Sequence, residues 1–127
     1  MNNPLQVYGA TKVDTSLHEA SPHKLIALLF ERMSSAIALA RGHHARGDFE
    51  AKAGEINKVV DIVSYMTQII DEDQAGEVTE SLKAAYSAVV ARALEAGASG
   101  LDEHYDDVQR AIVNLSSGWE AVNGAVD

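Results

Sequence analysis

Five histidines are the residues best suited to bind a metal or transfer a proton, and they are His18, His23, His43, His44 and His104. Helical bundles build di-iron sites from Glu-x-x-His motifs, but none of these histidines has a glutamate three positions before it. The His-Glu-x-x-His motif of zinc peptidases is also missing. The spacing therefore predicts solvated or helix-end histidines, with no bound metal and no other cofactor.

The acidic run 102–107 is the second place where chemistry is conceivable. It lacks the twelve-residue pattern and the central glycine of a calcium loop. An enzyme would have to use Glu103, His104 and Asp107 as its acid–base or metal-binding residues. The sequence has no cysteine, no glycine-rich phosphate loop and no Gly-x-Ser-x-Gly elbow. We therefore expect a solvated helix start rather than an active site, in a protein that is not an enzyme.

The charge balance narrows the choice of partner. Ten basic and nineteen acidic side chains give a net charge of −9 over 127 residues, which repels phosphate backbones and anionic lipids. The first residues, MNNPLQVYG, show neither the basic nor the apolar part of a signal peptide. We expect a cytoplasmic protein that binds no nucleic acid and does not insert into a membrane.

Apolar residues recur at helical spacing in four stretches, and strand patterns are missing. Ser21-Pro22 is a typical helix start, and Asp48 is a second N-cap candidate. The acidic residues 71–73 are unfavourable at the negative, C-terminal end of a helix and favourable near the start of the next helix. We expect a single all-α domain, 1–127, with an irregular or short-helical cap segment, 1–20, and helices at 21–46, 48–70, 77–97 and 101–122.

Short connections between long helices predict an antiparallel four-helix bundle. The last helix has the clearest seam, in which apolar residues alternate four and three apart: Leu101, Tyr105, Val108, Ile112, Leu115, Trp119 and Val122. Leu94 is expected to continue the inward face of the third helix, and Gly97 and Gly100 to end that helix.

The second helix carries more apolar residues than one inward face requires. Its expected core stripe consists of Ile56, Val60, Val63 and Ile70. A second stripe at helical spacing consists of Val59, Ile62, Met66 and Ile69. The third helix adds a row of small residues, Ala84, Ala88 and Ala91. Either the second helix lies deeper in the core, or the surplus forms a groove that an amphipathic partner helix fills.

The leading segment bears on this choice, because Leu5, Val7, Tyr8, Val13 and Leu17 are too apolar for a free tail. We expect it to dock on the bundle. It either ties down the terminus or covers the groove in competition with the partner.

Several stretches, in the same order along nearly the whole chain, resemble the FliS family of flagellar secretion chaperones. They are Tyr8, Val13, the run 20–26 (ASPHKLI), 29–31, Lys58 with Ile62, Val63 and Met66, the acidic connection 71–77 and Leu82, Tyr86, Arg92, Leu115, and Gly118 with Trp119.

This resemblance implies an antiparallel four-helix bundle that binds the disordered carboxy-terminal region of flagellin. Such a chaperone prevents premature polymerisation and assists delivery to the flagellar type III export apparatus, with the export gate as a further partner. We expect client binding at Tyr8, Val13, Val59, Ile62, Met66, Ile69, Leu82, Ala85, Tyr86 and Val89. The client-free chaperone is also considered as a homodimer. A self-associating structural or regulatory bundle, whose surplus apolar face makes a homodimer, stays open as an alternative function.

Overall fold

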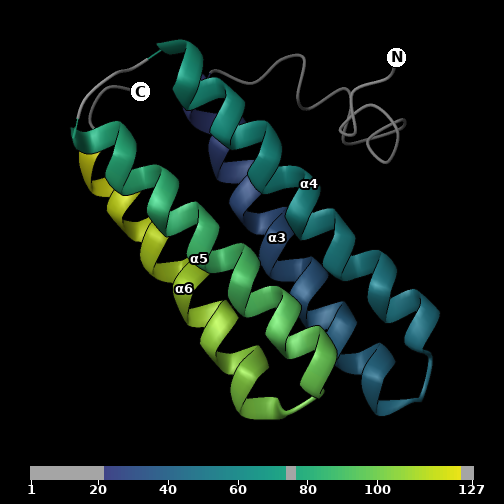
Figure 1. Cartoon of the computed structure of the whole chain (residues 1–127). Coiled ribbons are helices and arrows are strands. Elements are labelled where there is room, and N and C mark those ends of the chain that lie inside the picture. Colours follow the sequence, from purple (N-terminus) through teal and green to yellow (C-terminus); the bar gives the residue numbers. More distant parts are fainter. Residues whose placement is uncertain (1–21, 74–76, 124–127) are drawn as a thin grey trace.

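Four long helices make up the computed structural model, which describes residues 22–73 and 77–123 and the side-chain surroundings of 24–69 and 80–120. They are α3 (Pro22–Ala45), α4 (Phe49–Asp73), α5 (Glu77–Ser99) and α6 (Asp102–Asn123). Each helix packs against two neighbours, in the order α3, α4, α5, α6, and α6 closes the ring against α3. Consecutive helices run in opposite directions (Figure 1). The predicted all-α, antiparallel four-helix bundle is therefore confirmed.

The turn between α3 and α4 is made by a glycine and an aspartate that act on opposite helix ends. Gly47 has a positive φ of 76°, the left-handed conformation that commonly ends a helix. The amide of Asp48 then donates to the carbonyl of His43 at 2.9 Å. The Asp48 carboxylate accepts a hydrogen bond from the amide of Ala51 at 3.3 Å, as the predicted N-cap should.

The turn between α5 and α6 lies at the same end of the bundle (Figure 1). Gly100 has a φ of 70°, and its amide donates to the carbonyl of Ala96 at 2.8 Å. The His44 ring, from the end of α3, lies directly over this glycine, because an ideal Cβ at Gly100 would be 2.1 Å from the ring. Lys52 Nζ lies 3.3 Å from Nδ1 of His44 and donates to the Gly97 carbonyl at 2.7 Å. This contact joins the two turns.

Two predicted helix ends differ from the structure by more than one residue. The helix expected at 48–70 continues through 71–73, because carboxylates at a helix C-terminus cost only about 0.3–1 kcal/mol each. The third helix passes through Gly97 and ends at Ser99. Gly97 is a packing residue, since a Cβ there would lie 3.3 Å from Cγ1 of Ile56, and Gly100 alone provides the left-handed cap.

The core contains apolar side chains from all four helices. Its largest fully buried members are Leu29, Met33, Ile37, Val59, Ile62, Met66, Val89, Tyr105, Val108 and Ile112. The seam predicted for the last helix is confirmed from Tyr105 to Ile112, but Leu101 is exposed. Leu94 is exposed as well, so the expectation that it faces inward is wrong. About half of the surface of each residue is accessible, although both lie at helical spacing from buried residues.

Arg41 links α3 to the start of α6 on the surface of the bundle. Its guanidinium lies 2.7 Å from the Asp106 carboxylate and 3.3 Å from that of Asp102. It also lies 5.5 Å from the centre of the Tyr105 ring, a distance at which a cation is attracted to the ring face. These contacts add to the core in holding α6 against α3.

None of the described helices is long and apolar enough to cross a membrane.

Replacing Ile62 with alanine should lower the free energy of unfolding by about 2–5 kcal/mol, because it empties a fully buried site on α4. The matched control is Asp61→Ala at the exposed neighbouring position, which should change it by less than about 0.5 kcal/mol. Urea unfolding followed by circular dichroism measures both. If Ile62→Ala and Asp61→Ala both lower the free energy of unfolding by the same small amount, Ile62 lies on the surface.

The two turn glycines should respond differently to alanine. Gly47→Ala should lower the free energy of unfolding by about 1–2 kcal/mol, which is the penalty for an alanine in the left-handed conformation. No further loss is expected at this position, because nothing lies within 4 Å of the added Cβ. Gly100→Ala should cost more, because the new methyl group also meets His44. The double variant His44→Ala/Gly100→Ala should recover this additional loss of stability, which thermal unfolding measures. If both glycine variants lose the same stability, the His44 contact is not tight.

Stability should fall at alkaline pH because of Tyr86. Burial raises the pKa of its phenol to about 12 from an ordinary value of 10.0. Between these two pH values the tyrosine ionises in the unfolded chain but not in the folded one, so rising pH favours unfolding. Tyr86→Phe removes this dependence. The stability difference between wild type and variant should therefore shift in favour of the variant as the pH rises from about 10 to about 12. If the stability difference between wild type and Tyr86→Phe stays constant over this pH range, the Tyr86 phenol is accessible to solvent in the folded protein.

Candidate functional site

Half of the predicted client-binding residues lie in the interior of the bundle. Val59, Ile62 and Met66 of α4 and Tyr86 and Val89 of α5 are all buried. The expectation of an open second stripe on α4 is therefore wrong for its first three residues, which pack in the core beside Ile56 and Val63. A partner on the surface of this bundle cannot touch these five side chains unless the helices separate.

The remaining predicted residues divide into two groups. Ile69 and Leu82 are half-buried and pack against the core, and Ala85 is half-buried as well. Tyr8 and Val13 lie outside the described residues, as does the whole predicted cap segment. The small-residue row of α5 faces outward, because Ala84 and Ala91 are exposed and Ala88 is half-buried. The structure therefore places the predicted site on the surface only in part.

Among the residues whose side chains the structure describes, five large apolar ones are exposed that the sequence did not single out as surface residues. They are Leu39, Phe49, Leu94, Leu101 and Val113, with between 49% and 56% of their surface accessible. All four helices, or the turns next to them, contribute. Singly exposed apolar residues are ordinary, so exposure alone assigns none of them to a binding site.

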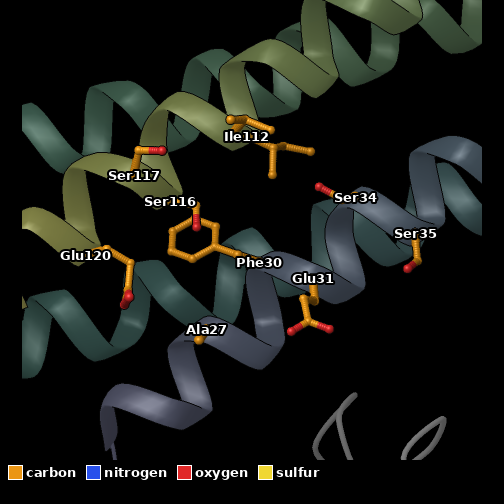
Figure 2. Close-up of a pocket in the computed structure, with 10 residues that line it drawn as sticks. Ala27, Phe30, Glu31, Ser34, Ser35, Ile112, Ser116, Ser117 and Glu120 are labelled. Atoms are coloured by element: carbon orange, nitrogen blue, oxygen red, sulfur yellow. The ribbon is translucent and has the colours of Figure 1, made fainter. Parts of the chain in front are cut away.

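A cleft of about 470 Å³ lies between α3 and α6. Its floor is formed by Phe30 and Ile112, which are almost fully buried. Figure 2 shows the Phe30 ring between the two helices, with Ser116 beside it. The cleft exists because the residues around this floor are small: Ala27, Ser34, Ser35, Ser116 and Ser117. Helical periodicity does not reveal it, since the hollow depends on short side chains from two helices more than 70 positions apart.

The cleft has a polar and acidic lining above its apolar floor. Its lining carries two carboxylates, Glu31 from α3 and Glu120 from α6, but no lysine, arginine or histidine. Val113, one of the exposed apolar residues, lies at its edge. The side-chain amide of Gln109 donates to the carbonyl of Ser34 at 2.9 Å, which holds α6 against α3 next to the cleft. An apolar floor with polar, acidic walls suits an amphipathic ligand.

The residues considered for catalysis have structural contacts instead. His43 Nδ1 lies 3.0 Å from the Arg46 guanidinium, and His104 Nδ1 lies 2.6 Å from the Ser99 hydroxyl. Asp107 pairs with Arg110 at 3.0 Å, one turn further along α6. Within 22–73 and 77–123, no group of three or more histidine, aspartate or glutamate side chains is placed to hold a metal ion.

The comparisons with known proteins cover nearly the whole chain. Residues 2–126 match the family model described as "Flagellar protein FliS". Similar proteins include "Flagellar secretion chaperone FliSB" of Pseudomonas aeruginosa, 27% identical with 94% of each chain covered. Two others are named "Flagellar secretion chaperone FliS". That of Salmonella typhimurium is 26% identical, with 94% of this chain and 89% of the relative covered.

The "Flagellar secretion chaperone FliS" of Vibrio cholerae is 24% identical, with 96% of this chain and 90% of the relative covered. In each case the similarity includes all four helices rather than one motif, which agrees with the stretches identified in the sequence. The chain belongs to the FliS family of flagellar proteins.

Proposed function

We propose that this protein is a flagellar secretion chaperone that binds the disordered carboxy-terminal region of flagellin in the cytoplasm. Binding keeps the flagellin subunits from polymerising too early and assists their delivery to the flagellar type III export apparatus. The observation that carries the proposal is the family match over 2–126 together with relatives named as flagellar secretion chaperones. The FliS family is a family of chaperones, so the protein is not an enzyme and Glu103, His104 and Asp107 have no catalytic role.

The bundle offers the kind of surface that this function requires. Apolar side chains are exposed on several sides of a closed core, and a disordered segment that folds on binding can contact several such places along its length. Each contact gains only about 25 cal/mol per Å² of apolar surface buried. Affinity therefore depends on a long client segment that covers several helices.

The client contacts proposed from the sequence are revised by the burial pattern. Ile69, Leu82 and Ala85 are accessible enough to contact a client directly. Tyr8 and Val13 keep the role that the family resemblance implies, as residues that both cover the bundle and contact the client. Val59, Ile62, Met66, Tyr86 and Val89 instead support this surface from below, because they fill the core under it.

A calorimetric titration with a peptide of flagellin's carboxy-terminal region tests the proposal. We expect saturable binding with one peptide per bundle and a negative heat-capacity change from apolar burial. Circular dichroism should show a gain of helix beyond the sum of the separate components. A scrambled peptide of the same composition is the control. A lack of heat change for the native peptide, with a homodimer by mass measurement, would support the self-associating alternative instead.

Replacing Ile69 with serine should weaken peptide binding by about tenfold, which corresponds to about 1.4 kcal/mol of lost apolar contact. The control is Gln68→Ser at the exposed neighbouring position, which should bind the peptide like wild type. Thermal unfolding of both variants shows whether the bundle itself is intact. Equal affinities for a folded Ile69→Ser variant and its control would remove Ile69 from the contact surface.

A further inference from the structure

The interface between α3 and α6 differs from the other three interfaces of the ring. Each of those joins helices that follow one another in the chain, through the short connections 46–48, 74–76 and 100–101. α3 and α6 are the first and the last of the described helices, so no such connection links them directly (Figure 1). Side-chain packing and polar contacts have to keep the ring closed at this interface.

The interface is tightly closed along the first half of α6, residues 102–112. Three apolar side chains of this half are almost fully buried: Tyr105, Val108 and Ile112. The guanidinium of Arg41 on α3 lies 2.7 Å from the carboxylate of Asp106. The side-chain amide of Gln109 donates to the carbonyl of Ser34 at 2.9 Å. The core and these polar contacts therefore fix the first half of α6 against α3.

The same interface is hollow along the second half of α6. Within residues 113–120 none of the side chains is buried, and Leu115 and Trp119 are only half-buried where they pack against the core. The cleft of about 470 Å³ lies here, and the short side chains of Ser116 and Ser117 form part of its wall (Figure 2). An unfilled space removes dispersion contacts from the atoms that line it. Packing therefore holds this half of α6 less strongly than the first half.

The second half of α6 is also a weak helix on its own. Five of the eight residues in 113–120 have lower helix propensity than alanine, leucine or glutamate: Val113, Asn114, Ser116, Ser117 and Gly118. Glycine is the least favourable of them, because it loses the most backbone freedom in a helix. Tertiary packing usually supplies most of the stability of a helix. Here weak packing and low propensity coincide in the same two turns.

We propose that the last part of α6, residues 113–123, is a latch that opens and closes while the rest of the bundle stays folded. Ile112 is the last buried residue before the latch, so the helix separates from α3 beyond this point. Opening uncovers the side of Phe30 that lines the cleft and leaves the first half of α6 in place. The opening is a property of the bundle itself and requires no client.

Native-state hydrogen exchange of the backbone amides tests whether the latch opens as a unit. We expect the amides of 114–120 to share one protection factor, at least about tenfold below that of 105–112, and one common dependence on urea. Ordinary fraying predicts a different result, in which protection falls gradually towards the end of the helix and does not depend on urea. That result, or equal protection in both halves of α6, would overturn the proposal.

A matched pair of glycine substitutions tests whether helix propensity controls the latch. Gly118 of α6 and Gly54 of α4 are both exposed inside long helices, and nothing lies within 4 Å of a Cβ added at either position. Gly118→Ala should raise the protection of the latch amides by about twofold to fivefold, the gain expected when alanine replaces a helical glycine. Gly54→Ala should leave it unchanged. An equal response to the two substitutions would show that these amides exchange without a separate opening of the latch.

Trp119 provides an independent probe, because it is the only tryptophan of the chain and lies in the latch. In a urea titration its fluorescence should change at a lower urea concentration than the far-ultraviolet circular dichroism signal, which reports all four helices. Gly118→Ala should bring the two midpoints closer together, whereas Gly54→Ala should not. Coincident midpoints in the wild-type protein would show that the latch unfolds only together with the bundle, contrary to the proposal.

Discussion

Closure of the four helices into a ring is the constraint on which the rest of the structure depends. A helix that touches neighbours on two sides has to bury a wider arc than a single apolar stripe provides. α4 meets this need with both of its stripes, because Ile56 lies against Gly97 of α5 while Val59 and Ile62 are fully buried in the core. The apolar residues that looked surplus in the sequence are therefore required to close the ring.

A closed core changes where a partner can bind. The buried stripe of α4 is unavailable, so in the proposed function the binding energy would come from half-buried positions such as Ile69 and from scattered exposed residues such as Leu94. Each of these buries little area, and association has to offset the ordering of a disordered client. Many weak contacts along an extended segment fit a chaperone that must later release its client, since such a segment can detach stepwise without unfolding the bundle.

Local signals in the sequence were sufficient for the elements and insufficient for the surface. Asp48 was recognisable as an N-cap because capping depends on neighbouring residues alone. Periodicity also located the α6 seam from Tyr105 to Ile112, but it assigned Leu101 and Leu94 to the interior. Spacing gives the direction of a face, whereas burial depends on where the neighbouring helices lie. For the same reason the sequence predicts a helix end at Gly97, although this residue lies inside α5 and packs against Ile56 of α4.

The cleft shows most clearly what a single sequence omits. Its apolar floor of Phe30 and Ile112 lies below walls of serine and alanine, with Glu31 and Glu120 in the lining. Each of these residues has an ordinary place on its own helix, and the hollow arises only because short side chains of α3 and α6 meet in the packed bundle. A single sequence gives no signal for such a meeting, because the lining residues of the two helices lie more than 70 positions apart.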